Sequence, residues 1–210
     1  MNSENEITEM HLDVLKEIGN IGAAHAATSL SQLLGQKIDM RVPNVELVTF
    51  DEMFNLAGGS EKVVAGIFLR IEGDLTGTMF FVLTIESATQ FIRKLTGDTS
   101  FTFTDAEDLG MGASALQELG NILSGSYLSS LSDFTSLNIY PTVPSLSIDM
   151  VGAIVSFGLI EVSQYSDEVI VIETEILQEG EHGMSSLAGH FFLLPDPPSY
   201  RTIFSSLGVL

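Results

Sequence analysis

The N-terminal part of the chain carries a pattern of small and apolar residues typical of a helix that packs one face on a core. From Thr8 to about Leu34 these residues recur at spacings of three and four. They are Leu12, Leu15, Gly19, Gly22, Ala23 and Ala26. Thr8 is the expected N-cap. A second segment of this kind opens at Thr104-Asp105-Ala106-Glu107, which fits a capping box. The pattern therefore predicts two long helices, one in each half of the chain.

Each predicted long helix is followed by short segments rich in β-branched and aromatic residues, which indicate strands. They cover 45–50, 63–71 and 78–84 in the first half, and 148–160, 169–176 and 190–194 in the second. The apolar run over 150–160 is about half as long as the roughly 20 residues that a membrane helix needs, so we expect a buried strand there. A shorter helix is expected to close each half, over 86–95 and 200–207.

The two halves resemble each other when the numbering is shifted by 101. Eleven identities, including Glu17 with Glu118 and Asn20 with Asn121, fall between residues 13 and 43. Chance would give about two, so an internal repeat is indicated. We predict one α/β (α+β) domain over residues 1–210, built with pseudo-twofold symmetry from two αβββα units at approximately 8–97 and 104–207. Its sheet is expected to pack against the two long helices.

Charge and composition exclude several classes of protein. The chain has 28 Asp and Glu against 8 Lys and Arg, a net charge of −20. Such a field repels nucleic acid and anionic membrane surfaces, so neither nucleic-acid binding nor membrane insertion is expected. The lack of cysteine excludes a disulfide scaffold, a thiolate metal site and a cysteine nucleophile. The acidic, polar start does not fit an export signal, so we expect a cytoplasmic protein.

Each long helix is expected to carry one polar stripe, whose members fall within about 60° of one another around the helix axis. The first stripe is Asp13, Glu17, Asn20 and Ala24, and the second is Ser114, Glu118, Asn121 and Gly125. The leucines lie largely on other faces, so each stripe can face solvent while the opposite side packs on a sheet. Core packing does not preserve an exposed Glu and Asn. Their recurrence therefore favours a functional role over accidental matches on a helix surface.

The chemistry of a Glu and an Asn three residues apart narrows the reactions that such a stripe can support. The pair lacks the second carboxyl group of a glycosidase and any relay between nucleophile and base. A carboxamide can hold a water by donating and accepting at once, as the water-positioning glutamines of GTPases do. A nearby carboxylate can bind a cationic group on a partner. The pair therefore suits hydrolysis of a phosphoryl group presented by another protein, with the metal supplied there.

Both stripes resemble the motif of the CheC family of chemotaxis phosphatases, which includes CheX and FliY proteins and shares its fold with the middle domain of FliM. The motif is Asp or Ser, three residues, Glu, two residues, Asn, then 22 residues and Pro. The chain contains it twice, as Asp13, Glu17, Asn20 and Pro43 and as Ser114, Glu118, Asn121 and Pro144. The surrounding sequence also resembles that of the CheC family, in the segments LKEIGNIGAAHAATSLSQLLG and LQELGNILSG. One departure is Ala24-His25, where many relatives have Gly-Asn.

The resemblance implies an enzyme that hydrolyses the phospho-aspartate of a chemotaxis response regulator of the CheY type. Asn20 and Asn121 would each enter the regulator's site and orient the attacking water, while Glu17 and Glu118 would bind its lysine, so that one chain carries two active sites. Magnesium would belong to the regulator, and no cofactor of the chain's own is expected.

Family members also pair with the receptor deamidase CheD, which is therefore a second expected partner. An alternative function is a non-catalytic binding module that regulates CheD or acts as a flagellar-switch adaptor, in which the stripes only dock. This alternative predicts stable binding of a partner without faster loss of phosphate.

Overall fold

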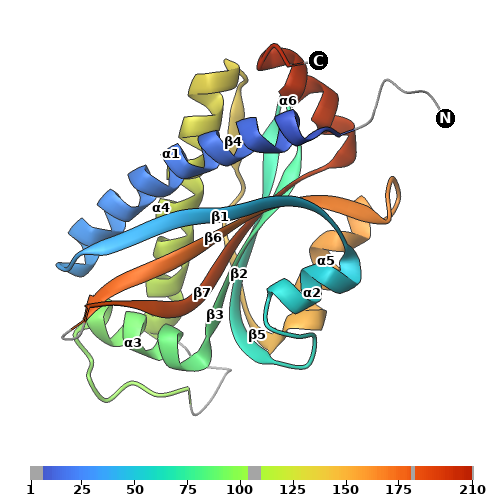
Figure 1. Ribbon diagram of the computed structural model, residues 1–210. Helices are drawn as coiled ribbons and strands as arrows, with labels where there is room; N and C mark the ends of the chain where they lie inside the picture. Colours follow the sequence, from blue (N-terminus) through green and yellow to red (C-terminus); the bar gives the residue numbers. More distant parts are fainter. Residues whose placement is uncertain (1–6, 104–109, 181–182, 210) are drawn as a thin grey trace.

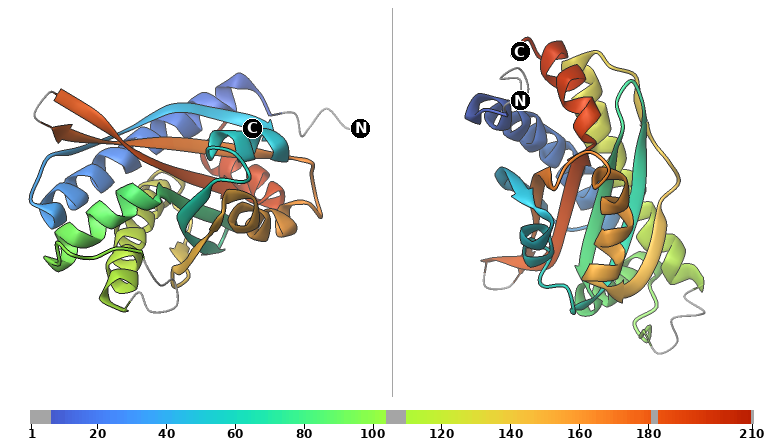
Figure 2. Two further views of the ribbon diagram at one scale, coloured as in Figure 1. Left: turned by 90° about the horizontal axis from the view of Figure 1, so that it is seen from below. Right: turned by 90° about the vertical axis from the view of Figure 1, so that its right-hand side faces the viewer.

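The computed structural model describes residues 7–103, 110–180 and 183–209, which form a sheet with helices on both faces (Figures 1 and 2). The two long helices are α1 (Glu9–Leu34) and α4 (Gly110–Thr135). The shorter helices are α2 (Phe50–Leu56), α3 (Ile85–Thr96), α5 (Val151–Val162), η1 (Pro197–Ser199) and α6 (Tyr200–Ser206). The strands are β1 (Ile38–Thr49), β2 (Val63–Gly73), β3 (Gly77–Thr84), β4 (Ile139–Pro141), β5 (Ser145–Met150), β6 (Glu168–Gly180) and β7 (Gly183–Pro195).

Local sequence signals explain where α1 begins and ends. Thr8 precedes the helix as predicted, and its backbone N–H donates to His11 Nδ1 at 3.1 Å. Gly35 ends the helix in the left-handed conformation, which glycine adopts without steric cost. The capping box predicted at 104–107 lies outside the described residues.

His11 also joins the two ends of the described chain. Because its Nδ1 accepts a hydrogen bond from Thr8, its Nε2 carries the ring proton and donates to the carbonyl of Val209 at 2.8 Å. The imidazole ring stacks on Phe204 in α6, with 4.1 Å between the ring centroids. The start of α1 is therefore held against the last helix.

The sheet exchanges strands between the two halves of the chain. Its order is β1-β6-β7-β3-β2-β4, β5 also pairs with β2, and every pairing is antiparallel. The hairpins β2–β3 and β6–β7 meet at the centre, where Phe80 lies opposite Phe192. Strand β1 of the first half pairs with β6 of the second, and β4 and β5 of the second half pair with β2 of the first. Each half thus supplies an edge strand to the other half's hairpin.

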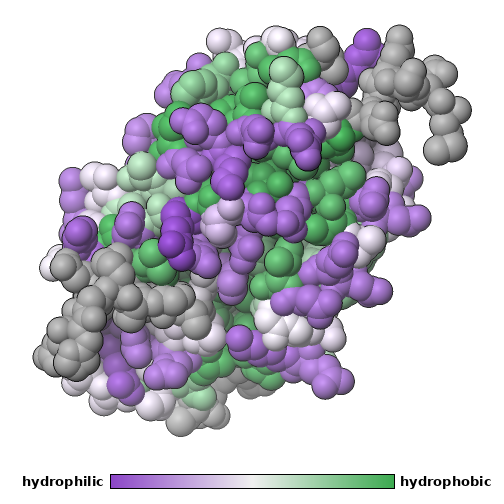
Figure 3. Space-filling view, viewed as in Figure 1, coloured by the Kyte–Doolittle hydropathy of each residue, from purple (hydrophilic) through white to green (hydrophobic). Residues whose placement is uncertain are grey.

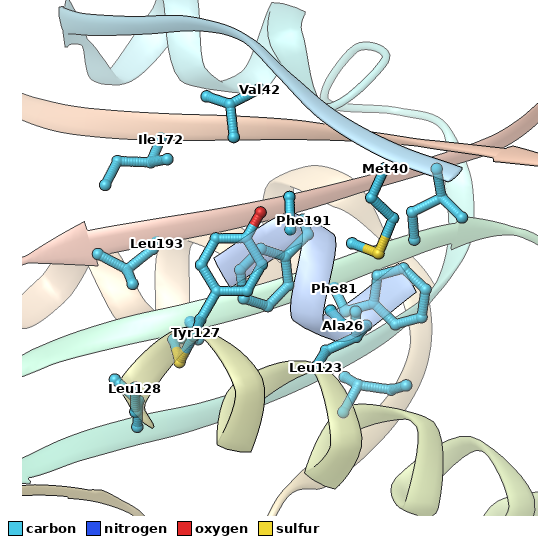
Figure 4. Packing of buried hydrophobic residues seen from close by; sticks show 14 of the residues in the cluster. Ala26, Met40, Val42, Phe81, Leu123, Tyr127, Leu128, Ile172, Phe191 and Leu193 are labelled. Atoms are coloured by element: carbon cyan, nitrogen blue, oxygen red, sulfur yellow. The ribbon is translucent and has the colours of Figure 1, made fainter. Parts of the chain in front are cut away.

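Alternate residues of the central strands point into two separate cores. Phe81 and Phe191 enter the core beneath α1, α3, α4 and α6 (Figure 4). Phe80 and Phe192 enter the second core, beneath α2 and α5. Both faces of β3 and of β7 over residues 191–194 are therefore buried, which explains why these segments are nearly continuous apolar runs.

Two polar contacts join the halves at the end of β2. The Asp74 backbone N–H donates to the carbonyl of Asn138 at 2.9 Å, and the Asn138 N–H donates to Asp74 Oδ2 at 2.7 Å. Arg70 makes a bidentate ion pair with the buried Asp196, with N–O distances of 2.6 and 3.2 Å, and also donates to Thr78 Oγ1. These bonds tie β2, β3 and the end of β7 together.

The predicted fold class and the packing of the sheet against two long helices are confirmed, but each repeat unit contains one more helix than predicted. In the first half, helix α2 follows the first strand, β1. In the second half the first strand is split into β4 and β5, and helix α5 follows them.

The buried strand predicted over 148–160 is wrong beyond Met150, because Val151–Val162 is helix α5. Its buried apolar side chains recur at spacings of one, three and four, as a helix requires. They are Val151, Ile154, Val155, Leu159 and Val162. The exposed positions Phe157 and Ile160 are also apolar, so the sequence shows no polar face that would reveal the helical period. No helix in the part of the chain that the structure describes is long and apolar enough to cross a membrane.

Candidate active site

Both predicted stripes lie at the surface of the long helices. In the first stripe Asp13, Glu17 and Ala24 are exposed and Asn20 is half-buried. In the second stripe Ser114, Glu118 and Asn121 are exposed and Gly125 is half-buried. Figure 3 shows hydrophilic side chains gathered over α1 and the neighbouring β1. The structure therefore presents Glu and Asn side chains of both helices to an approaching partner.

Two glycines let the motif helices lie close to the sheet. A Cβ atom at Gly19 would lie 3.1 Å from Ile172 Cγ2 and 3.2 Å from Val42 Cγ2. A Cβ atom at Gly120 would lie 2.8 Å from Ile67 Cγ2. Each glycine directly precedes the Asn of its stripe, so this close packing fixes the distance between the helix and the sheet at the position of the Asn. The recurrence of glycine before each Asn is therefore explained by packing against the sheet and not by a catalytic role of the glycine.

The two motif helices pack on each other through a third glycine. A Cβ atom at Gly22 would lie 3.2 Å from the Cα of Tyr127, so the backbones approach closely where α1 meets α4. The Tyr127 hydroxyl bonds with Thr174 Oγ1 of β6, and burial raises the pKa of this phenol well above its ordinary value. His25, part of the departure from the family motif, is exposed, and its Nδ1 lies 3.3 Å from Ser130 Oγ of α4. The two helices therefore pack directly on each other and together carry both stripes.

The first site lies where α1 passes the edge strand β1. Asn20 Oδ1 accepts a hydrogen bond from the backbone N–H of Val42 at 3.1 Å. The Lys16 ammonium donates to the carbonyl of Pro43 at 2.6 Å. The strand register shifts between Arg41 and Asn44, so this contact falls on an irregular part of β1. The motif proline is thereby placed beside the stripe, although it is far from it in the sequence.

The second site has a similar frame with different hydrogen bonds. Gln117 Nε2 donates to the carbonyl of Pro144 at 3.2 Å. Asn121 Nδ2 donates to Glu118 Oε2 at 3.5 Å, a long contact within the stripe itself. A Cβ atom at Gly125 would have no atom within 4 Å, so the surface past Asn121 is open.

Lys16 and Gln117 were not singled out by the sequence analysis. They occupy aligned positions one residue before each repeated Glu, but they are not identical, so a search for identities passes over them. Lys16 and Gln117 are equivalent because each donates a hydrogen bond to the carbonyl of its motif proline, a contact that only the structure shows.

The two sites occupy opposite edges of the sheet. The first lies beside β1, which is the edge strand at one end of the strand order. The second lies beside the connection between β4 and β5, which pair with β2 at the other end. Each site therefore has a separate surface of approach.

A matched pair of glycine substitutions in α4 tests this packing. Gly120→Ala is expected to destabilise the protein by about 1 kcal/mol, because the cost of overpacking against Ile67 exceeds the gain in helix propensity. Gly125→Ala is expected to stabilise it by up to about 1 kcal/mol, because its Cβ meets open space. Denaturant unfolding followed by circular dichroism measures both. Equal changes in the two variants would contradict the close contact at Gly120.

The described residues contain no group of three or more His, Asp or Glu side chains placed to hold a metal ion. The carboxylates of the stripes instead have carboxamides as neighbours. Such a site can position water and bind cations of a partner.

Three features together define a class of protein: the repeated helices, the sheet with exchanged edge strands, and the paired Glu and Asn stripes. Comparison with known families shows which family the chain belongs to. The model of the CheC-like family matches residues 10–47 and 111–148, two segments offset by the 101 residues of the internal repeat. The CheY-P phosphatase CheC of Bacillus subtilis (strain 168) is 50% identical over 207 residues, which cover 97% of each chain. The chain belongs to the CheC-like family.

Solved structures share the fold at lower sequence identity. FliY from Thermotoga maritima superimposes with a TM-score of 0.70 and 24% identity, over 96% of this chain and 98% of that one. The FliM middle domain from Vibrio alginolyticus has a TM-score of 0.59 and 17% identity, over 92% and 97% of the two chains. CheX in the CheX-CheY-BeF3-Mg+2 complex from Borrelia burgdorferi has a TM-score of 0.52 and 18% identity, over 83% and 95%. The expected likeness to the FliM middle domain is therefore confirmed.

Proposed function

We propose that the protein is a phosphatase that hydrolyses the phospho-aspartate of a CheY-type response regulator. The observation that carries this proposal is the stripe of Glu and Asn at the helix surface, present twice in a chain that is 50% identical to a CheY-P phosphatase over 97% of its length. The relation of CheX to CheY in a solved complex supports the same class of partner.

The carboxamides of Asn20 and Asn121 are suited to the chemical step. Phosphoryl transfer needs little covalent chemistry from the protein, and it depends on placing the attacking oxygen in line with the bond that breaks. A carboxamide can accept one hydrogen of a water and donate to its oxygen, which fixes the orientation of the nucleophile. Rigid support of the two helices keeps this side chain in place as the regulator closes over it.

The carboxylates of Glu17 and Glu118 are suited to docking. Each is exposed and lies one helical turn from the Asn of its stripe, so it can pair with a lysine at the edge of the regulator's phosphorylation site. An ion pair that becomes desolvated at an interface contributes to affinity and fixes the relative position of the two proteins. Magnesium is assigned to the regulator, where it offsets the charge of the phosphoryl group.

The primary test is the decay of a phosphorylated CheY-type regulator in magnesium buffer with and without catalytic amounts of the protein. We expect faster decay with more than one turnover per protein molecule. Stable binding of the phosphorylated regulator without faster decay would support the non-catalytic binding module instead.

Removing both carboxylates is expected to weaken docking more than chemistry. In the variant Glu17→Ala/Glu118→Ala, the KM for the phosphorylated regulator should rise about tenfold or more, because the regulator's lysine loses its partner, while kcat falls less. Steady-state kinetics at fixed ionic strength measures both constants.

The control Glu61→Ala/Glu86→Ala removes the same two charges from exposed positions outside the stripes. It should leave KM nearly unchanged. An equal rise in KM in both double variants would mean that overall charge, and not the stripe, controls binding.

A CheD-type deamidase is proposed as a second partner, on the family resemblance alone. Docking of CheD and hydrolysis need not share a surface, so a pull-down of CheD with the Asn20→Ala/Asn121→Ala variant tests this partner independently of catalysis. The cytoplasmic location expected from the sequence stays a prediction.

A further inference from the structure

The motif proline lies at an interruption of the strand pairing in both halves. Proline has no backbone N–H and cannot complete a sheet ladder. In the first half the pairing of β1 with β6 shifts register between Arg41 and Asn44, on either side of Pro43. In the second half β4 ends at Pro141 and β5 begins at Ser145, directly after Pro144. The carbonyl of each motif proline is therefore available to a group outside the sheet.

In both halves this carbonyl is bound by the side chain that precedes the motif Glu. Lys16 Nζ donates to Pro43 O at 2.6 Å, and Gln117 Nε2 donates to Pro144 O at 3.2 Å. The shift of 101 relates both donors and both acceptors. An ammonium and a carboxamide thus make the same contact. The recurring feature is the hydrogen bond rather than the type of residue.

The place of this bond links it to the chemistry of the sites. The donor is the neighbour of Glu17 or Glu118 in the chain and lies about one turn before the Asn of the stripe. In the first half a second bond, from the Val42 N–H to Asn20 Oδ1, joins the same interrupted strand to the stripe itself. A shift of the strand along the helix would therefore move the Asn and the Glu relative to the sheet.

We propose that Lys16 and Gln117 are positioning residues of the two active sites, each holding its stripe in register with the sheet edge through the carbonyl of the motif proline. This inference rests on the proposed phosphatase function and deepens it. It explains why the motif contains a proline 23 positions beyond the Asn. The proline leaves an interrupted strand whose carbonyl the helix can bind.

The test measures each site in a chain whose other site is silenced. Lys16→Met and Lys16→Gln are made in the Asn121→Ala background, and Gln117→Met and Gln117→Lys in the Asn20→Ala background. Methionine removes the donor; its side chain is as long as that of glutamine and one atom shorter than that of lysine. The exchanges between Lys and Gln keep a donor.

We expect kcat for the phosphorylated regulator to fall about tenfold in Lys16→Met and about threefold in Gln117→Met, because a bond from a charged donor is the stronger one. KM should change less than twofold. Lys16→Gln and Gln117→Lys should recover most of the lost kcat. The melting temperature is measured in parallel. A purely structural role would lower the melting temperature but would not lower kcat while leaving KM nearly unchanged.

An NMR measurement gives a readout that does not need turnover. The exchange rate of the Val42 amide hydrogen should rise severalfold in Lys16→Met and not in Lys16→Gln, because release of Pro43 loosens the bond to Asn20. If neither the unmodified protein nor the silenced backgrounds show turnover, the phosphatase function fails, and the exchange rates still decide whether Lys16 holds the strand.

Two results would overturn the assignment. One is an unchanged kcat in both methionine variants. The other is an equal loss in Lys16→Gln and Lys16→Met, which would show that the charge of Lys16 acts on the regulator and that the bond to Pro43 does not position the site.

Discussion

Replacing Asn20 and Asn121 together by alanine is expected to reduce the acceleration of regulator dephosphorylation at least about 100-fold. This is the scale on which removing one preorganised polar group from an active site slows catalysis. Both side chains lie at the surface of long helices, so their loss removes the water-orienting groups without opening a cavity in either core. The measurement is the decay rate of the phosphorylated regulator at saturating and subsaturating concentrations.

The control for this variant is Asn55→Ala/Asn138→Ala, which removes two exposed carboxamides outside the stripes. It should retain the parental rate. The variant at Asn20 and Asn121 should unfold within about 1 kcal/mol of the parent, since the described residues lose only the bond between Asn20 and the Val42 amide and the long surface contact between Asn121 and Glu118. Full activity in that folded double variant would contradict a water-positioning mechanism.

Gly73→Ala is expected to cost about 3 kcal/mol or more of unfolding free energy. Gly73 has a φ of 117°, a conformation that other residues rarely adopt, and a Cβ atom there would lie 2.1 Å from the carbonyl oxygen of Asn138. That same oxygen accepts the hydrogen bond from Asp74. The added methyl group therefore separates β2 of the first half from the start of β4 in the second. Thermal unfolding should show a melting temperature lower by roughly 6–12 °C.

Gly97→Ala is the matched control for this prediction. Gly97 also has a positive φ, of 75°, but its Cβ would meet no atom within 4 Å. Only the backbone cost of about 1 kcal/mol applies there. Similar destabilisation in the two variants would mean that the conformation of the glycine matters at position 73 and that the contact with Asn138 does not.

Local pattern and internal alignment were sufficient to locate the long helices, the duplication and the two stripes. A helix with one buried face and one solvent face repeats its apolar residues every three or four positions, and this period is visible in α1 and α4 without any knowledge of their partners. The same reasoning failed for α5, because both its buried face and its exposed residues Phe157 and Ile160 are apolar.

The pairing of the strands was decided by the tertiary structure alone. The repeat suggests two similar units, but it cannot show that β1 pairs with β6 and that β4 and β5 pair with β2. Edge strands of two similar units present equivalent hydrogen-bonding groups and apolar faces, so local preference is the same for either partner. The exchange becomes favourable only when both hairpins meet at the centre and the motif helices cover them.

For the two sites as well, the sequence predicts what depends on local helix geometry, and only the tertiary structure shows what depends on long-range packing. Glu17 and Asn20 share a helix face with Asp13 because of helical geometry, which the chain itself specifies over a few residues. The contacts of Lys16 with Pro43 and of Gln117 with Pro144 join positions 27 residues apart. They depend on how closely each helix lies on its sheet edge. That closeness is set by long-range packing at Gly19 and Gly120, which no local pattern contains.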